Sequence, residues 1–115
     1  MSSQVVTDFL AAWLRQDVDA VLDCLTDDVV YAPAVGPTYE GKEEVGKAMA
    51  AEITADLGGI ELILDDPVGL GDHVLGGWAL ATATGEIFRR GVDVYLIRDG
   101  KISVKDQFRK VYERD

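Results

Sequence analysis

The segment "RRGVDVYLIRDGKISVKDQFRK" constrains the fold more than any other part of the sequence. Two runs rich in β-branched and aromatic residues flank Asp99-Gly100, and Asp-Gly is a preferred two-residue loop of β-hairpins. The segment therefore predicts an antiparallel hairpin. Each of its strands has an aspartate in its interior, Asp93 and Asp106, where a strand usually holds a β-branched or aromatic residue.

Two registers of this hairpin give the aspartates different neighbours. A type I′ turn places Asp93 opposite Asp106, with two carboxyls about 5 Å apart that could share a proton. A three-residue loop with a glycine bulge instead places Asp93 opposite Lys105. The sequence favours the first register because it gathers five apolar side chains on one buried face: Tyr95, Ile97, Ile102, Val104 and Phe108.

A coupled pair of carboxyls on an apolar face is suited to general acid and base catalysis, because its two members differ in how readily they hold a proton. The alternative is that both aspartates are structural, either facing solvent or neutralised by an arginine: Arg89, Arg90 or Arg109. Both interpretations remain open on the sequence alone.

The rest of the chain predicts helices first and strands afterwards. Apolar residues in "SSQVVTDFLAAWLRQD" recur at three- and four-residue steps, the pattern of an amphipathic helix. A short helix is expected from Asp17 to about Leu25, then a strand that runs into a proline-containing loop, and a third helix after Gly41. Four strands are expected to follow, at 60–65, 72–84, 91–98 and 101–112. The order α-α-β-α-β-β-β-β predicts an α+β domain, with a curved antiparallel sheet packed on three helices.

Length and charge exclude several classes of protein. A chain of 115 residues allows one domain, 1–115. The net charge of −10, without a basic cluster, argues against nucleic acid and anionic membranes as partners. A cytoplasmic location is the default expectation because the N-terminus lacks a signal-peptide pattern. Cys24 is the only cysteine and His73 the only histidine, so no disulfide, metal site or cofactor is predicted.

Three stretches together resemble the nuclear transport factor 2-like superfamily, in particular its branch of SnoaL-like polyketide cyclases, ketosteroid isomerases and limonene epoxide hydrolases. They are "FLAAWLRQDVDAVLDCLTDDVVYAPAVG", "YEGKEEVGKAM" and "VDVYLIRDGKISVKDQF". The resemblance covers nearly the whole chain. It implies a cone-shaped sheet around an apolar cavity that the helices close, and it is more specific for the fold than for a reaction.

The resemblance to ketosteroid isomerases is partial. Asp93 matches the aspartate that those enzymes keep protonated to donate a hydrogen bond to a substrate oxyanion. Their partner tyrosine falls at Phe9, and their catalytic base falls near Ala32-Pro33, where no carboxylate is present. The usual steroid isomerisation is therefore not expected.

The resemblance to epoxide hydrolases is partial as well. Asp106 matches their last-strand aspartate and is similar to the acidic residue that polyketide cyclases use for proton transfer. The Arg-x-Asp of the epoxide hydrolases falls in "GGWALATA", which has no charge. The resemblance thus implies a minimal acid/base site, with Asp106 as general base and Asp93 as a protonated donor.

We expect from this a small-molecule enzyme that isomerises, cyclises or hydrates a hydrophobic substrate without a cofactor. The alternative is a non-catalytic binding or interaction module. Six aromatic residues are predicted to bind the substrate: Trp13, Phe9, Tyr95, Trp78, Tyr31 and Phe108. The outward face of the hairpin carries an apolar stripe that predicts a homodimer: Val92, Val94 and Leu96.

Overall fold

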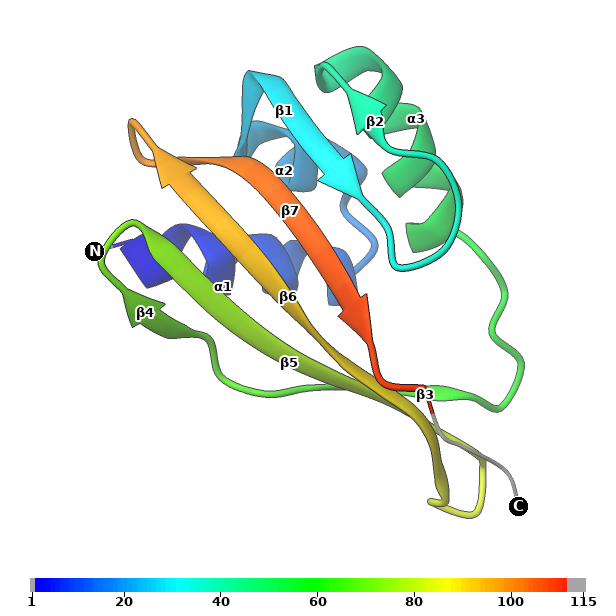
Figure 1. Cartoon of the computed structure of the whole chain (residues 1–115). Helices are drawn as coiled ribbons and strands as arrows, with labels where there is room; N and C mark the ends of the chain where they lie inside the picture. The colour runs from blue at the N-terminus through cyan, green and yellow to red at the C-terminus, as the bar shows by residue number, and fades with distance from the viewer. Residues whose placement is uncertain (1, 112–115) are drawn as a thin grey trace.

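Helices cover one face of a curved sheet whose two edges do not meet, so the sheet is not a closed barrel (Figure 1). The computed structural model describes residues 2–111. Within these residues the helices are α1 (Ser2–Leu14), α2 (Val18–Asp23) and α3 (Lys42–Ile53). The strands are β1 (Leu25–Ala32), β2 (Tyr39–Glu40), β3 (Glu61–Leu64), β4 (Val68–Leu70), β5 (His73–Ala81), β6 (Ile87–Arg98) and β7 (Lys101–Arg109). The predicted α+β class is confirmed.

The helices form where the apolar spacing and the capping residues predict them. Val6, Phe9 and Ala12 of α1 are at most 1% exposed, as expected for one stripe of an amphipathic helix. Asp17 caps α2 by accepting a hydrogen bond from the Ala20 amide at 3.1 Å. The predicted extension of this helix to Leu25 is wrong, because Leu25 is fully buried as the first residue of β1.

The sheet has the order β2-β1-β7-β6-β5-β3, and β4 pairs with β5 outside this path. Strands β5, β6 and β7 form the antiparallel meander that the sequence predicts. Strand β1 pairs with β7 in parallel, an arrangement that the expected all-antiparallel sheet did not include. The short strands β2 and β4 lie in segments that were expected to be loops.

The hairpin of β6 and β7 contains a β-bulge that neither predicted register includes. Arg98 pairs with Lys101 and Ile97 with Ile102, as a two-residue Asp-Gly loop requires. The next pair is Leu96 with Val104, so one residue of β7, Ser103, has no partner of its own in the ladder. The Ser103 hydroxyl donates a hydrogen bond to the Leu96 carbonyl at 3.2 Å.

Side chains alternate between the two faces of a sheet, so this single extra residue moves every later side chain of β7 to the opposite face. Asp93 pairs with Gln107 and Val94 with Asp106, so the predicted opposition of Asp93 and Asp106 is wrong. Lys105 replaces Asp106 on the face that carries Asp93. The bulge thereby replaces a like-charge pair with a pair of opposite charges.

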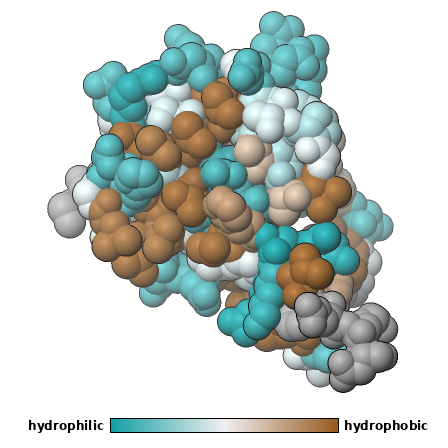
Figure 2. All heavy atoms as spheres, viewed as in Figure 1, coloured by the Kyte–Doolittle hydropathy of each residue, from teal (hydrophilic) through white to brown (hydrophobic). Residues whose placement is uncertain are grey.

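The core lies between the inner face of the sheet and the helices, with side chains from α1, α2, α3, β1 and the β5–β7 meander. None of the helices described is long and apolar enough to cross a membrane. The outer sheet face turns away from the helices, and apolar side chains gather on it (Figure 2).

Candidate active site

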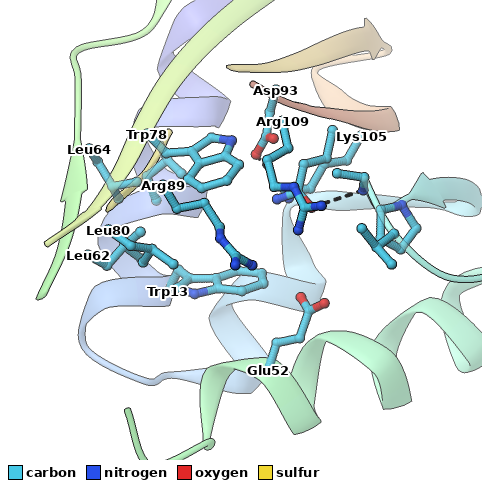
Figure 3. Close-up of a pocket in the computed structure, with 15 residues that line it drawn as sticks. Trp13, Glu52, Leu62, Leu64, Trp78, Leu80, Arg89, Asp93, Lys105 and Arg109 are labelled. Atoms are coloured by element: carbon cyan, nitrogen blue, oxygen red, sulfur yellow. Dashed lines mark hydrogen bonds and ion pairs between the residues drawn. The ribbon is translucent and has the colours of Figure 1, made fainter. Parts of the chain in front are cut away.

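A pocket of about 330 Å³ opens between α1, α3, the loop after β1 and the inner sheet face (Figure 3). Its lining combines apolar side chains with five charged ones. The apolar residues are Leu10, Trp13, Pro33, Ala34, Val35, Leu62, Leu64, Trp78 and Leu80. The polar and charged residues are Glu52, Arg89, Asp93, Lys105, Gln107 and Arg109.

An ion pair between Asp93 and Lys105 lies at the inner side of this pocket. The Lys105 ammonium is 3.0 Å from Asp93 Oδ2, and the two side chains are only 5% and 9% exposed. The same ammonium lies over two aromatic rings, 4.7 Å from the centroid of Tyr31 and 5.5 Å from that of Trp13. Because both partners are buried, loss of either side chain would leave the other as an uncompensated buried charge.

Two buried polar atoms of the pocket lining have no hydrogen-bond partner within residues 2–111. Asp93 Oδ2 also accepts a hydrogen bond from the Tyr95 hydroxyl at 3.3 Å, whereas Oδ1 has no partner. Trp78 Nε1 is likewise buried and unpartnered. Gly91, opposite Trp78 in the ladder, leaves room for the indole, because a Cβ there would collide with the ring. The pocket lining thus contains one buried acceptor and one buried donor without a partner, although buried polar groups are normally hydrogen-bonded.

Glu52 of α3 is the second carboxyl in the pocket. Its carboxylate accepts a hydrogen bond from the Tyr31 hydroxyl, which lies 2.9 Å from each of the two oxygens. Burial raises the pKa of Glu52 above its ordinary value, although the Tyr31 hydrogen bond and the Lys105 charge work against that rise. The pKa of Tyr31 is also raised, first by burial and then by the Glu52 charge, so this hydroxyl remains a donor. Glu52 is therefore the group best suited to hold a proton.

We predict that Glu52→Gln stabilises the protein at neutral pH. The raised pKa means that the folded state binds this proton more tightly than the unfolded state does. Ionised Glu52 therefore costs stability above its folded-state pKa, and the cost disappears below the ordinary glutamate pKa of about 4.3. Thermal unfolding should show a higher midpoint for the variant at neutral pH and no advantage in acid. Exposed Glu43 supplies the control, since Glu43→Gln removes a carboxyl that is not buried and should leave the unfolding midpoint at neutral pH nearly unchanged. A wild type more stable than Glu52→Gln at neutral pH would contradict the prediction.

Five of the six residues that the sequence assigned to substrate binding fall into three groups. Trp13 and Trp78 line the pocket. Phe9 and Tyr95 pack beneath it in the core, with ring centroids 5.9 Å apart. Tyr31 is buried and holds Glu52.

The other two residues predicted for the site lie away from the pocket. Asp106 and Phe108 alternate with the pocket residues of β7 and so lie on the outer sheet face, where Phe108 is 52% exposed. The structure thus separates Asp106 from Asp93. The catalytic roles assigned to these aspartates stay predictions.

Glu52, Lys105 and the two pocket arginines, Arg89 and Arg109, were not among the site residues predicted from the sequence. Lys105 appeared only as the partner of Asp93 in the less favoured register, and that ion pair forms even though the register itself does not. Glu52 had the local signature of an ordinary helix residue. Within residues 2–111 no group of three or more His, Cys, Asp and Glu side chains could hold a metal ion.

Comparison with known proteins gives a family and a set of similar folds. The model of the SnoaL-like domain family matches residues 6–104. A protein of unknown function with the nuclear transport factor 2-like fold, from Mesorhizobium loti, is 20% identical; the match covers 96% of this chain and 91% of that one, with a TM-score of 0.82. A search of curated protein sequences found no significant match.

Two further solved structures of this fold have names that refer to enzymes. A proposed polyketide cyclase from Pseudomonas putida is 19% identical, with coverage of 96% and 92% and a TM-score of 0.75. An LEH-like epoxide hydrolase from M. tuberculosis is 23% identical, with coverage of 96% and 84% and a TM-score of 0.75. At these identities the comparisons show a shared fold.

Proposed function

The chain belongs to the SnoaL-like domain family, and from this we propose that it is a cofactor-free enzyme that transfers protons on a small, largely apolar molecule. Isomerisation, cyclisation and hydration are the reactions of this class. The observation that carries the proposal is the unpartnered Asp93 Oδ1, a carboxylate oxygen buried in the pocket lining. A buried acceptor without a partner is costly unless a ligand uses it.

In the proposed reaction Asp93 is the base, the role that the sequence assigned to Asp106. Asp93 Oδ1 takes a proton from a substrate carbon next to a carbonyl, and the electron pair of the broken C–H bond moves onto the carbonyl oxygen. Trp78 Nε1 is a free donor that can stabilise the negative charge on that oxygen. The indole nitrogen lies on the side of the ring that faces Asp93 (Figure 3). Lys105 fixes the Asp93 carboxylate, and Glu52, with its raised pKa, can return a proton.

Proton exchange with solvent tests this proposal without knowledge of the natural substrate. Small apolar ketones and enones are incubated with the protein in D₂O, and loss of the α-proton signal is followed by NMR. We expect exchange that saturates with ketone concentration, as binding in a pocket requires. Exchange no faster than that caused by an equal concentration of acetate, for every compound, would contradict the proposal and favour a binding module without catalysis.

We also propose that the protein forms a homodimer through its outer sheet face. The predicted stripe of Val92, Val94 and Leu96 is only partly buried, and exposed Phe108 extends it. Sedimentation velocity should give a dimer for the wild type and a monomer for Val94→Glu, because a second carboxylate opposite Asp106 would be left unpaired in the interface. A wild type that remains monomeric at millimolar concentration would contradict the proposal.

A further inference from the structure

The pocket has a charge balance opposite to that of the whole chain. Acidic residues outnumber basic ones by 21 to 11 in the sequence. The pocket lining instead has three basic side chains, Arg89, Lys105 and Arg109, and two acidic ones, Glu52 and Asp93. Burial raises the pKa of Glu52 and so favours its uncharged, protonated form. When Glu52 is protonated, the net charge of the pocket is more positive. Such a pocket attracts an anion even though the protein as a whole repels one.

Arg89 and Arg109 carry positive charge that no described side chain neutralises. Lys105 is paired with Asp93. Neither Arg89 nor Arg109 has a hydrogen bond or an ion pair to any side chain within residues 2–111, whereas Arg98, on the same strand as Arg89, is paired with Asp28. Figure 3 shows both guanidinium groups directed into the pocket, from neighbouring strands. A guanidinium binds a carboxylate through two parallel hydrogen bonds, so this is a suitable place for one.

The remaining wall is suited to an apolar body of limited size. Six of its side chains are leucine or tryptophan: Leu10, Leu62, Leu64, Leu80, Trp13 and Trp78. A volume of about 330 Å³ corresponds to roughly eleven water molecules, at about 30 Å³ each, which suits a ligand of one or two rings or a short alkyl chain. The pocket thus combines an apolar wall with a cationic pair.

We propose that the substrates of this pocket are hydrophobic carboxylic acids, with the carboxylate held by Arg89 and Arg109 and the apolar body against the leucine and tryptophan wall. The inference rests on the proposed function, in that such an acid must also carry the carbonyl whose neighbouring carbon gives up its proton to Asp93. It goes further by requiring a negative charge on the ligand. In this proposal the arginines bind the carboxylate and Asp93 takes the proton.

Calorimetric titration with matched acids and amides tests the inference without requiring turnover. The probes are naphthylacetate, phenylbutyrate and octanoate, each compared with its primary amide, which has nearly the same shape and no charge. We expect at least one acid to bind about tenfold or more tightly than its amide, since a hydrogen bond to a charged group contributes about 1.5–3 kcal/mol. Added salt should weaken binding of the acid and leave the amide unaffected.

Variants of the two arginines identify the source of the preference. Arg89→Gln with Arg109→Gln should abolish the preference for the acid while leaving amide affinity unchanged, which also shows that the double variant folds. Arg90→Gln is the matched control, because Arg90 neighbours Arg89 in the sequence and is not part of this pocket lining. Equal affinity for acid and amide in the wild type, a preference that survives the double variant, or no binding of any acid would overturn the inference. Acid preference without ketone exchange would support the inference and count against the proposed function alone.

Discussion

Replacing Lys105 with methionine is expected to lower the free energy of unfolding by about 3–5 kcal/mol. Methionine matches the length of the lysine stem but leaves Asp93 as a buried charge without its counter-ion, since the Asp93 side chain is only 9% exposed. The loss of the ammonium also removes the cation that lies over the Tyr31 and Trp13 rings. The expected loss of stability is large because the Asp93 carboxylate stays buried, away from water, without a counter-ion.

Urea unfolding of a double-mutant cycle measures this coupling. Lys105→Met and Asp93→Leu should each be strongly destabilised, and the variant that carries both should regain much of the loss, because it leaves no buried charge alone. Additive losses, or a loss under about 1 kcal/mol for Lys105→Met, would show that the pair is open to water and would contradict its burial. The Glu43–Lys47 pair on the surface of α3 is the control. Replacing one of these two residues should change the free energy of unfolding by less than about 1 kcal/mol.

Asp93→Asn is expected to lower the rate of ketone proton exchange by about 10²–10⁴-fold, the usual contribution of a positioned base. Asparagine keeps the shape of aspartate and can still accept a hydrogen bond from Tyr95, but it does not take up a proton in this pH range. The affinity for a ketone should change far less than the rate, since the wall that contacts its apolar body is unaltered. A drop in affinity with an unchanged maximal rate would make Asp93 a binding residue.

Loss of folding must be separated from loss of catalysis in this variant. Asp93→Asn leaves Lys105 without a counter-ion, so it too is expected to be less stable. Combining it with Lys105→Met removes both charges and should restore a cooperative thermal transition. We expect this stable double variant to be as inactive as Asp93→Asn, because neither holds the carboxylate. Activity in the double variant would rule out Asp93 as the base.

The sequence predicted the elements of this fold well because their signals are local. The helical stripe of α1, the Asp17 cap and the Asp-Gly turn each depend on residues close in sequence. The parallel pairing of β1 with β7 was missed because nothing local in either strand indicates a partner so far away in the chain.

The bulge at Ser103 shows how a local signal can be correct and its consequence wrong. The turn sets the first two pairs as predicted, and the apolar alternation of β7 favoured an unbroken ladder. Without the bulge, Asp93 and Asp106 would share one face as like charges, which is unfavourable. The bulge brings Lys105 to Asp93 and moves Val104 and Phe108 to the outer face. Glu52 and the arginines were missed for a related reason, since their role depends on which strands and helices meet at the pocket.

The most direct test of the central claim compares Asp93→Asn and Asp106→Asn in the same exchange assay, with the same ketone and at equal concentrations of folded protein. The two residues lie on neighbouring strands, and the bulge places them on opposite faces of the sheet. If the pocket is the catalytic site, Asp93→Asn loses at least about a hundredfold in rate and Asp106→Asn stays within about twofold of the wild type. A large loss in Asp106→Asn with normal turnover in Asp93→Asn would contradict the account and return the base to the residue that the sequence assigned.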